Sequence, residues 1–476
     1  MAQPICRSAR LLTQAFCRKS SRTKLPGRVS ALKRQNDDLT RRPSYEPSRD
    51  RTHESTLFVE LSNRGLLDAC TNEKLLEEGR SLRVYCGFDP TADSLHIGNL
   101  LGIVVLSWFQ TYGHKPVALI GGATARVGDP SGKSTERPVL EESVIQSNGA
   151  AIANTLKRIL FKGVDSNQIL VVNNFDWYSS MSILDFLRDI GKFSRVGTML
   201  AKDSVKSRLQ SENGISFTEF SYQLLQGYDF VHLWREHDVS VQVGGSDQWG
   251  NITAGTDLIH RLEPSADVSG LTFPLLLKSD GTKFGKSEQG AIWLSAERLS
   301  PYKFYQYFLS VEDSDVIRLL KMLTFLPLPQ IQDIETSMKQ SNYVMNSAQT
   351  RLAEEVTRFV HGIDGLQEAQ QATAILKPGL NTELDVQALS TLRGVVPSAD
   401  LPMSKVIGSN IVDLVVEVGL QPSKGATKRL IKGGGLQLNN VKVMSDELTV
   451  CPDDVIGGKL LLLAAGKKNK LLVSIS

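Results

Sequence analysis

Cysteine, long apolar runs and net charge are all scarce in this sequence. Its five cysteines form no CxxC pair and no metal-ligand spacing, so we expect reduced thiols and no metal site. No stretch approaches the roughly 18 apolar residues that a membrane-spanning helix needs, so we expect a soluble protein without a membrane partner. The 54 basic and 51 acidic residues leave a net charge of only +3, which indicates no overall basic field for nucleic acid.

The charge is nevertheless uneven at the N-terminus. Nine Lys or Arg residues precede the first acidic residue, Asp37, and Leu11, Leu12 and Phe16 can share one face of a helix. An acid-free, Arg- and Ser-rich start is typical of a mitochondrial presequence, whereas charges interrupt every apolar run that a secretory signal would need. We therefore expect a presequence and linker over 1–45 and a location in the mitochondrial matrix. A basic tail without a targeting role is the alternative.

The remaining length suits two to four domains of about 100–200 residues each. Short apolar runs at 83–88, 117–120, 169–172 and 239–243 read as strands, and helical stretches such as 100–112 and 142–161 separate them. This alternation predicts an α/β fold with a Rossmann-like parallel sheet and ligands at the carboxyl ends of its strands. From a helix start at Ser300-Pro301 the pattern becomes helical, and near Leu401 it changes to mixed helix and strand signals.

The first candidate site is the segment 85–99, at a predicted strand-to-helix junction. Free backbone N–H groups and the helix dipole favour a phosphate there. Gly87 and Gly98 would let a flat ligand approach the backbone closely, and Thr91 and His96 could donate hydrogen bonds to phosphate oxygens. A threonine and a histidine at a helix start can equally be caps.

The second candidate, at 121–134, nearly spells a phosphate-binding P-loop, GxxxxGK[ST]. The first glycine of that pattern would fall on Val127, which counts against a P-loop NTPase or kinase. Asp129 could instead pair with the ammonium group of a ligand at the edge of the sheet.

The third candidate lies on a predicted helix, where Tyr222, Gln226 and Asp229 share one face at spacings i, i+4 and i+7. Such polar faces are usually solvated. Here the neighbours Leu224 and Leu225 make the surroundings apolar, which indicates an enclosed polar pocket.

Two glycine-containing turns complete the set. Asp247 follows a predicted strand and is placed either to accept from ribose hydroxyls or to cap the next helix. Lys283 and Lys286 flank Gly285 on a loop that would suit a clamp on a polyphosphate, although a KxxK pattern alone is a weak signal.

Together these segments occur in an order and spacing that resembles the class I tyrosyl-tRNA synthetases from about residue 57 onward. His96–Asn99 resembles the HIGH signature of that family, with Asn99 in place of the second His, and Lys283–Ser287 resembles its KMSKS loop. An Asn amide can donate one hydrogen bond as an imidazole N–H does, so we expect function to survive this change.

The resemblance implies a domain order and a set of partners. It implies a catalytic domain over 46–295 with an inserted connective segment at about 173–238, and a helical anticodon-binding domain over 296–395. A small α+β RNA-binding domain of the ribosomal S-four type would follow over 401–476. ATP, as a substrate with Mg²⁺, L-tyrosine and tRNA(Tyr) are the implied ligands, without a prosthetic group, and a homodimer is expected.

The resemblance also assigns roles to matching positions. Tyr85 and Asp229 would bind the phenolic hydroxyl of tyrosine. The other expected tyrosine-binding residues are Asp129, Tyr222, Gln226, Gln242 and Gln248. The expected ATP-binding residues are Cys86, Gly87, Asp89, Thr91, Gly98, Gly245, Asp247 and Lys286. The expected catalytic residues are His96, Asn99, Lys283 and Lys286.

In the C-terminal region, Ser423 could cap a helix on which Lys424, Lys428 and Lys432 fall at i, i+4 and i+8 with Arg429 alongside. The S-four resemblance implies that these four basic residues contact tRNA phosphates, so that affinity would fall with salt. A solvated basic face is the alternative.

We therefore predict an enzyme that activates L-tyrosine as tyrosyl-adenylate and transfers it to tRNA(Tyr) in mitochondrial translation. The nearest rival is a tryptophanyl-tRNA synthetase, against which the pair Tyr85 and Asp229 argues because both suit a phenolic hydroxyl. A synthetase-derived RNA-binding protein, such as an intron-splicing cofactor, is the alternative from a different functional class.

Overall fold

The computed structural model describes residues 56–133, 135–136, 138, 140–160, 169–287, 290–376, 384, 386–390, 392–466 and 469–476. The predicted presequence and linker over 1–45 lie outside these residues. Contacts divide the chain into residues 1–49 and 50–476, and the description below concerns the second unit. Within the part of the chain that the structure describes, no helix combines the length and the apolar character needed to cross a bilayer.

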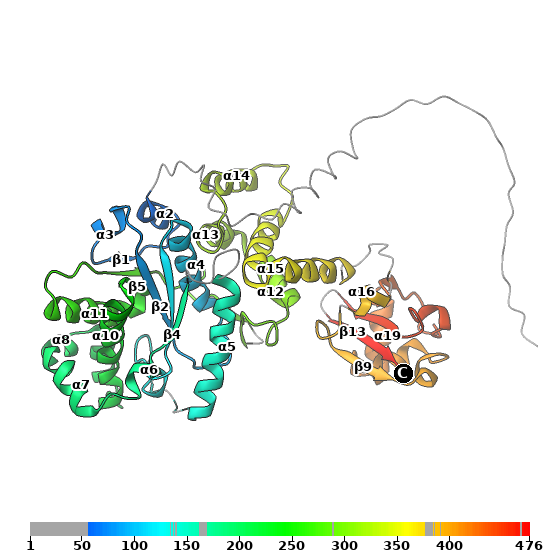
Figure 1. The fold of residues 1–476 in the computed structure, drawn as a ribbon. Coiled ribbons are helices and arrows are strands. Elements are labelled where there is room, and N and C mark those ends of the chain that lie inside the picture. The colour runs from blue at the N-terminus through cyan, green and yellow to red at the C-terminus, as the bar shows by residue number, and fades with distance from the viewer. Residues whose placement is uncertain are drawn as a thin grey trace, which may run out of the picture. The chain divides into compact units, whose positions relative to one another are not determined.

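A six-stranded sheet in the order β1-β6-β5-β2-β3-β4 forms the first layer (Figure 1). Its strands are β1 Ala69–Cys70, β2 Arg83–Phe88, β3 Lys115–Ile120, β4 Leu170–Asn173, β5 Val239–Gly245 and β6 Ser269–Phe273. All neighbouring pairs are parallel except β1 with β6. The four strands expected from the sequence, β2 to β5, are confirmed. Because β2 lies between β3 and β5, the order of the strands reverses there, which is where such sheets bind ligands.

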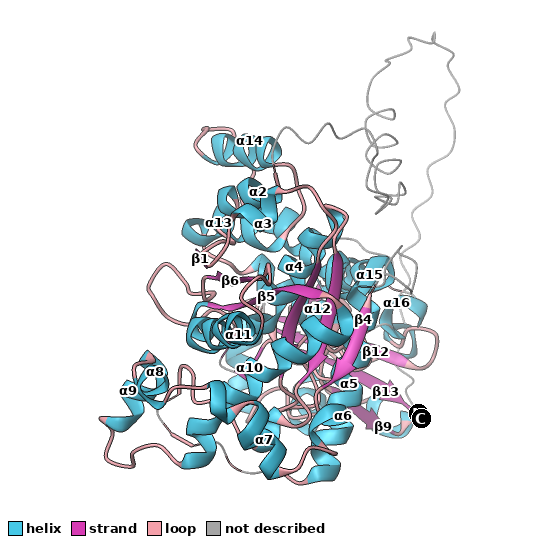
Figure 2. Cartoon of the chain, turned by 60° about the vertical axis from the view of Figure 1, so that its left-hand side comes forward, coloured by secondary structure: helices cyan, strands magenta, loops and turns pink. Residues whose placement is uncertain are grey.

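Helices cover both faces of this sheet (Figure 2). Cys86 of β2 belongs to the core that also holds α4 (Ile97–Thr111) and α5 (Glu142–Leu160). Tyr85 belongs to the core of α10 (Phe217–His237) and α11 (Trp249–Leu262) on the other face. The two-residue period of a strand thus sends neighbouring side chains to opposite layers.

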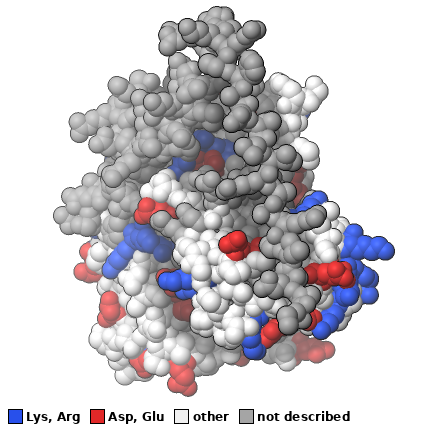
Figure 3. Space-filling view, turned by 90° about the vertical axis from the view of Figure 1, so that its right-hand side faces the viewer, with Lys and Arg blue, Asp and Glu red and all other residues white. Residues whose placement is uncertain are grey.

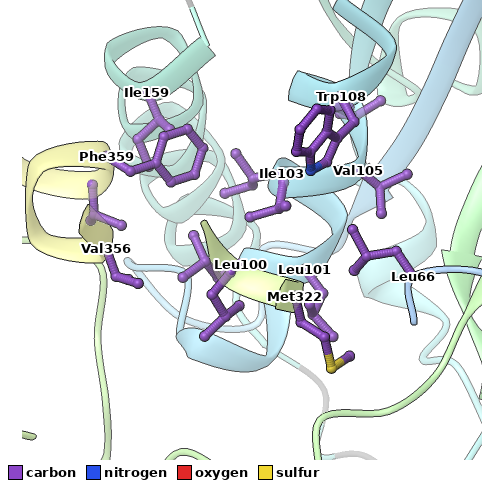
Figure 4. Close-up of a cluster of buried hydrophobic side chains, with 14 of the residues drawn as sticks. Leu66, Leu100, Leu101, Ile103, Val105, Trp108, Ile159, Met322, Val356 and Phe359 are labelled. Atoms are coloured by element: carbon purple, nitrogen blue, oxygen red, sulfur yellow. The ribbon is translucent and has the colours of Figure 1, made fainter. Parts of the chain in front are cut away.

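Helix α4 is buried almost throughout because it is apolar on nearly every side. Figure 4 shows its Leu100, Leu101, Ile103, Val105 and Trp108 among side chains from other elements, namely Leu66, Ile159, Met322, Val356 and Phe359. Burial of one such aliphatic or aromatic side chain contributes about 1.5–3 kcal/mol. This packing fixes the N-terminal end of α4, where His96 stands.

The segment between β4 and β5 is helical. It contains α6 Phe175–Tyr178, α7 Ile183–Asp189, the 3₁₀ turn η3 Gly191–Phe193, α8 Val196–Leu200 and α9 Asp203–Leu209, and then continues into α10. A buried ion pair at 2.6 Å between Arg208 and Glu219 joins α9 to α10. Two further helices, α2 Leu57–Asn63 and α3 Lys74–Glu77, precede β2.

Helices also dominate from residue 301 to 390. They are α12 Pro301–Leu309, α13 Asp313–Leu323, α14 Leu328–Met338, α15 Ser347–Leu376 and α16 Val386–Ser390. Ser300 caps α12 and Pro301 occupies its first turn, as expected. A short pair of strands, β7 Lys286–Ser287 and β8 Gly290–Ala291, precedes these helices.

The C-terminal region builds a second sheet in the order β11-β10-β12-β13-β9. Its elements are β9 Ser398–Leu401, α17 Met403–Val406, α18 Ile411–Glu417, α19 Lys424–Lys432, β10 Leu436–Leu438, β11 Val441–Lys442, η5 Pro452–Asp454, β12 Leu460–Ala465 and β13 Asn469–Ile475. Asn439 and Asn440 both have positive φ and join β10 to β11, as a two-residue hairpin turn requires. The predicted fold class, a Rossmann-like α/β region, a helical region and a C-terminal α+β region, is therefore confirmed.

Candidate active site

A cavity of about 690 Å³ opens at the carboxyl ends of β2, β3 and β5. All the predicted tyrosine-binding, ATP-binding and catalytic residues except Lys286 line this cavity: Tyr85, Cys86, Gly87, Asp89, Thr91, His96, Gly98, Asn99, Asp129, Tyr222, Gln226, Asp229, Gln242, Gly245, Asp247, Gln248 and Lys283. The side chain of Lys286 lies outside the described residues. The fold thus gathers five separate sequence segments around one space.

One part of the cavity holds the pair Tyr85 and Asp229. Tyr85 is 1% exposed, and within the described part of the chain its hydroxyl has no hydrogen-bond partner. Burial, and then the charge of Asp229, raise the pKa of Tyr85 well above its ordinary value. Burial also raises the pKa of Asp229 to about 8. An unpartnered buried hydroxyl beside a buried carboxyl indicates a polar ligand group between them.

Two residues that the sequence analysis did not identify hold Asp229 in place. Asn174 Nδ2 donates to Asp229 Oδ2 at 3.0 Å, and Trp177 Nε1 donates to Oδ1 at 3.0 Å. Both follow β4, at the same edge of the sheet as the other candidate residues. Its place among the polar residues directly after a predicted strand was a signal that could have found Asn174, whereas nothing in the sequence marked Trp177.

Asp89 joins two subsites that the sequence analysis had kept apart. Its carboxylate accepts from the Tyr222 hydroxyl at 3.0 Å and from Thr124 Oγ1 at 2.8 Å. Asn174 Nδ2 in turn donates to Thr124 Oγ1 at 3.1 Å. A continuous hydrogen-bonded chain therefore runs from Asp229 through these residues to Tyr222.

Asp129 is a buried carboxylate that three N–H donors orient. The donors are the backbone N–H of Ser131 at 2.9 Å, Gln248 Nε2 at 2.8 Å and Asn251 Nδ2 at 3.3 Å. Gln242 is also buried, and its Oε1 has no hydrogen-bond partner among the described residues. An oriented carboxylate and an unpartnered carbonyl oxygen can both accept hydrogen bonds from a cationic group.

Gly245 and Asp247 meet at the end of β5. A Cβ on Gly245 would lie only 2.6 Å from Asp247 Oδ1, so a side chain would collide there. Burial, and then the charge of Asp129, raise the pKa of Asp247. Gly245 occupies the N-cap position of the 3₁₀ turn η4 (Ser246–Gln248), and Gln248 that of α11, so the alternative of Asp247 as an N-cap is wrong.

His96 and Asn99 form a capping box at the start of α4. His96 Nδ1 accepts from the backbone N–H of Gly98 at 3.0 Å, and Asn99 Oδ1 accepts from the backbone N–H of His96 at 3.1 Å. Because Nδ1 is an acceptor, the proton of the neutral ring lies on Nε2. Desolvation, and then the charge of Lys133, lower the pKa of His96, which favours this neutral form. The His96 ring can therefore cap α4 through Nδ1 and still donate a hydrogen bond to a ligand through Nε2–H.

Two lysines belong to the lining of this cavity. Lys133, from the segment that resembles a P-loop, lines it together with Lys283. The charge of Lys133 helps to lower the pKa of His96, and the charge of Lys283 opposes the rise in the pKa of Asp247. We had not predicted a role for Lys133, although its place in a near P-loop was a usable signal.

The predicted RNA-binding residues Lys424, Lys428, Arg429 and Lys432 lie on α19, which Ser423 caps as expected. Lys424 and Lys428 are exposed and pair with Asp413 at 2.7 Å and Asp446 at 3.0 Å. Such exposed ion pairs are weak, so a polyanion could displace them. On the face that Figure 3 shows, basic side chains are interspersed with acidic ones.

Among the described residues, no group of three or more His, Cys, Asp and Glu side chains could hold a metal ion.

Comparison with known proteins identifies the family. Residues 77–376 match the family described as tRNA synthetases class I (W and Y), and residues 390–473 match the tyrosine–tRNA ligase SYY-like C-terminal domain. The chain is 56% identical over 423 residues to the chloroplastic/mitochondrial tyrosine–tRNA ligase of Arabidopsis thaliana. The aligned region covers 87% of this chain and 83% of that protein. It is 50% identical over 416 residues to the tyrosine–tRNA ligase of Protochlamydia amoebophila, covering 87% and 98%.

A solved structure agrees. The C-terminally truncated mitochondrial tyrosyl-tRNA synthetase of Aspergillus nidulans superposes with a TM-score of 0.59 at 30% identity, over 72% of this chain and all of that one. The first family covers both tryptophan and tyrosine enzymes, and the C-terminal match and the relatives decide between them. The chain therefore belongs to the class I tyrosyl-tRNA synthetases and is a tyrosine–tRNA ligase.

Proposed function

We propose that this ligase works in two steps at the cavity described above. The carboxylate of L-tyrosine attacks the α-phosphate of ATP, which forms enzyme-bound tyrosyl-adenylate and releases pyrophosphate. The terminal ribose hydroxyl of tRNA(Tyr) then attacks the tyrosyl carbonyl, and AMP leaves. Neither step needs a nucleophile from the protein, so the side chains act by positioning the reactants and by stabilising charge on the phosphates.

The observation that carries this proposal is the buried pair Tyr85 and Asp229. The unpartnered hydroxyl of Tyr85 and the carboxyl of Asp229 suit a ligand that both donates and accepts at one oxygen, as a phenol does. We assign the phenolic hydroxyl of tyrosine to this place. Asn174 and Trp177 would hold the carboxyl in position without contacting the substrate.

The opposite pole of the tyrosine substrate would meet polar acceptors. We assign its ammonium group to Asp129, Tyr222 and Gln226, with Gln242 and Gln248 near the carboxylate. The support is that Asp129 is buried and already oriented by three donors, so little reorganisation is needed on binding.

ATP, the second substrate, would lie across the start of α4. We assign its ribose to Cys86, Gly245 and Asp247, and its phosphates to Asp89 and Thr91 with the backbone around Gly87 and Gly98. The neutral His96, through Nε2–H, and Asn99 would contact the departing pyrophosphate together with Lys283 and Lys286. We propose that Mg²⁺ enters with ATP, because this ion is commonly held by substrate phosphates and water.

Two other regions would serve tRNA. We propose the domain division 46–295, 296–395 and 401–476, with the connective segment at about 173–238. The helical domain would bind the anticodon, and Lys424, Lys428, Arg429 and Lys432 of α19 would bind tRNA phosphates.

We propose a homodimer that forms through the connective segment. Large apolar side chains are unusually exposed there: Ile183 by 67%, Leu184 by 72%, Val196 by 60% and Phe217 by 79%. Exposed apolar side chains gathered in one segment are typical of an interface. A Leu184→Glu variant should sediment as a monomer, whereas Val441→Glu, at an equally exposed position of β11, should not. A Leu184→Glu protein that stays dimeric would contradict this assignment.

We propose that the enzyme serves translation in the mitochondrial matrix. The support is the acid-free, basic N-terminal segment and the similarity to a chloroplastic/mitochondrial relative. A reporter fused to residues 1–45 should enter mitochondria. A reporter that remains in the cytosol, or enters chloroplasts alone, would contradict the location.

The activity itself is tested by an adenylation screen. Purified protein is incubated with ATP and each of the amino acids, with and without tRNA, and amino-acid-dependent exchange of pyrophosphate into ATP is measured. Exchange with tyrosine alone, without a requirement for tRNA, is the expected result. Exchange with tryptophan, or none with tyrosine, would overturn the proposal.

A further inference from the structure

Lys283 stands on a short hairpin-like loop between β6 and β7. The backbone N–H of Phe284 donates to the carbonyl of Leu276 at 2.9 Å, and Leu277 and Lys283 form an antiparallel bridge. A turn joins the two arms, where the N–H of Lys278 donates to the carbonyl of Thr282 at 2.7 Å. The lysine is itself exposed and lines the active-site cavity. Its position therefore depends on what holds the loop.

Helix α13 holds the first arm and the turn. The carboxylate of Asp315, a residue 3% exposed, accepts from the backbone N–H of Ser279 at 3.3 Å and from Arg318 at 2.8 Å. The same guanidinium nitrogen of Arg318 donates to the carbonyl of Leu277. One buried carboxylate and one guanidinium thus fix two points of the loop backbone.

Helix α12 holds the second arm. The hydroxyl of Tyr307 accepts from the backbone N–H of Gly285 at 2.9 Å. Phe284 is buried, and its ring and the Tyr307 ring pack in a T-shaped arrangement at a centroid distance of 5.3 Å. Tyr307 therefore holds the chain directly beyond Lys283 by one hydrogen bond and one aromatic contact.

The second arm is also pressed against the start of α4. Gly285 has φ +96°, and a Cβ there would lie 2.0 Å from Ile97 Cγ2, so no side chain fits. The backbone N–H of Ile97 donates to the carbonyl of Ile292 at 2.9 Å. His96 and Trp293 form an isolated antiparallel β-bridge. The loop that carries Lys283 and the helix start that carries His96 are therefore one packed unit.

We propose that Tyr307, Asp315 and Arg318 are positioning residues for adenylate formation: they place Lys283 and Lys286 against the phosphates by holding the loop backbone. This inference rests on the proposed role of the two lysines. It assigns to α12 and α13 a role in adenylate formation that the sequence does not reveal, because both helices follow the site motifs along the chain. Misplacement of a charged group by about 1 Å can reduce a rate by about 10²-fold, so loop anchors of this kind are kinetically important.

The test uses Tyr307→Phe, which removes the hydroxyl and keeps the ring. The full-length variant leaves the buried N–H of Gly285 without its acceptor, and we expect single-turnover adenylate formation to slow about tenfold. The dissociation constant of tyrosine and the rate of transfer from preformed adenylate to tRNA should stay at parental values, because neither involves the pyrophosphate side. Tyr305→Phe is the matched control, a buried tyrosine of the same helix that lies near Glu354 of α15.

A double-mutant cycle separates this inference from the proposed function. In a Lys283→Ala/Lys286→Ala background, Tyr307→Phe should slow adenylate formation by less than about twofold, because the groups it positions are gone. A full tenfold effect in that background, an equal effect of Tyr305→Phe, or a parental rate for Tyr307→Phe would overturn the positioning role. If the lysine variant itself forms adenylate at the parental rate, the proposed role of the lysines fails first, and the inference fails with it.

Discussion

Replacement of Asp229 by Asn should reduce the selectivity of this ligase for tyrosine over phenylalanine. The substitution keeps the shape of the side chain and removes the charge that Asp229 carries above its pKa of about 8. In the parent, both carboxylate oxygens accept, one from Asn174 and one from Trp177. An Asn side chain has only one acceptor oxygen, so its NH₂ group must face one of these two donors.

The size of the effect follows from the number of bonds changed. A hydrogen bond to a charged group contributes about 1.5–3 kcal/mol, and an unsatisfied buried donor costs about 1–3 kcal/mol. At 1.4 kcal/mol per factor of ten, the combined loss in kcat/KM for tyrosine is about 10²–10⁴-fold. Phenylalanine never makes the first of these bonds, so the preference for tyrosine should fall by about 10–100-fold. Tyrosyl-tRNA synthetases are themselves the standard example of such discrimination, about 10⁵-fold without editing, so part of the preference should remain.

The assay is pyrophosphate exchange at saturating ATP with tyrosine and phenylalanine in turn, at pH 9, where Asp229 with its pKa of about 8 is mainly ionised. Asp176→Asn is the matched control, because Asp176 is exposed and neighbours the same Trp177. It should retain the parental kcat/KM for both amino acids. An Asp229→Asn enzyme with an unchanged ratio of the two kcat/KM values would refute the assignment of the phenol to Asp229.

Three further outcomes are expected. The pKa of Asp229 is about 8 in the folded protein against an ordinary 3.8, so between these pH values the folded form holds a proton that the unfolded form has lost, and the folded protein loses stability as pH rises. The Tm of Asp229→Asn relative to the parent should therefore increase from pH 4 to pH 8 in calorimetry. A difference in Tm that stays constant would contradict the pKa shift. Arg64 is 2% exposed and donates to three backbone carbonyls at the end of α13. Arg64→Ala should therefore lower the free energy of unfolding, measured in urea, by about 3–5 kcal/mol. The control Arg188→Ala, at an exposed position, should stay within about 0.5 kcal/mol of the parent. Lys428→Ala and Arg429→Ala should each weaken tRNA binding and reduce the slope of log affinity against log salt by about one in filter-binding assays. Neither variant should change adenylate formation in pyrophosphate-exchange assays. A parental slope would argue against contacts with tRNA phosphates.

The elements of the fold were largely predictable because their signals are local. The apolar runs of β2 to β5, the Ser300-Pro301 start of α12 and the Ser423 cap of α19 depend on residues within a few positions of one another. Side-chain periodicity and capping are properties of the nearby backbone, so a single sequence contains them. The domain boundaries and the individual site roles stay predictions.

The geometry of the site depended on contacts that the sequence does not express. The sequence placed His96 and Asn99 together, but only the structure made them a capping box with the ring proton on Nε2. It also brought Asn174 and Trp177 to Asp229, more than 50 residues further along the chain. The packing of the sheet and its helices decides which polar side chains meet across such separations.

By itself, the sequence determined the α/β class, the motifs and most of the residues that line the cavity, because each motif is a short run with its own backbone requirement. Only the tertiary structure decided which side chains hold those residues in place. Tyr307 and Asp315 are the clearest case, since nothing in a helical stretch after residue 300 indicates that its side chains hold the loop of Lys283. The physical reason is that a positioning hydrogen bond is local in space and distant in sequence, so it exists only once the core has closed.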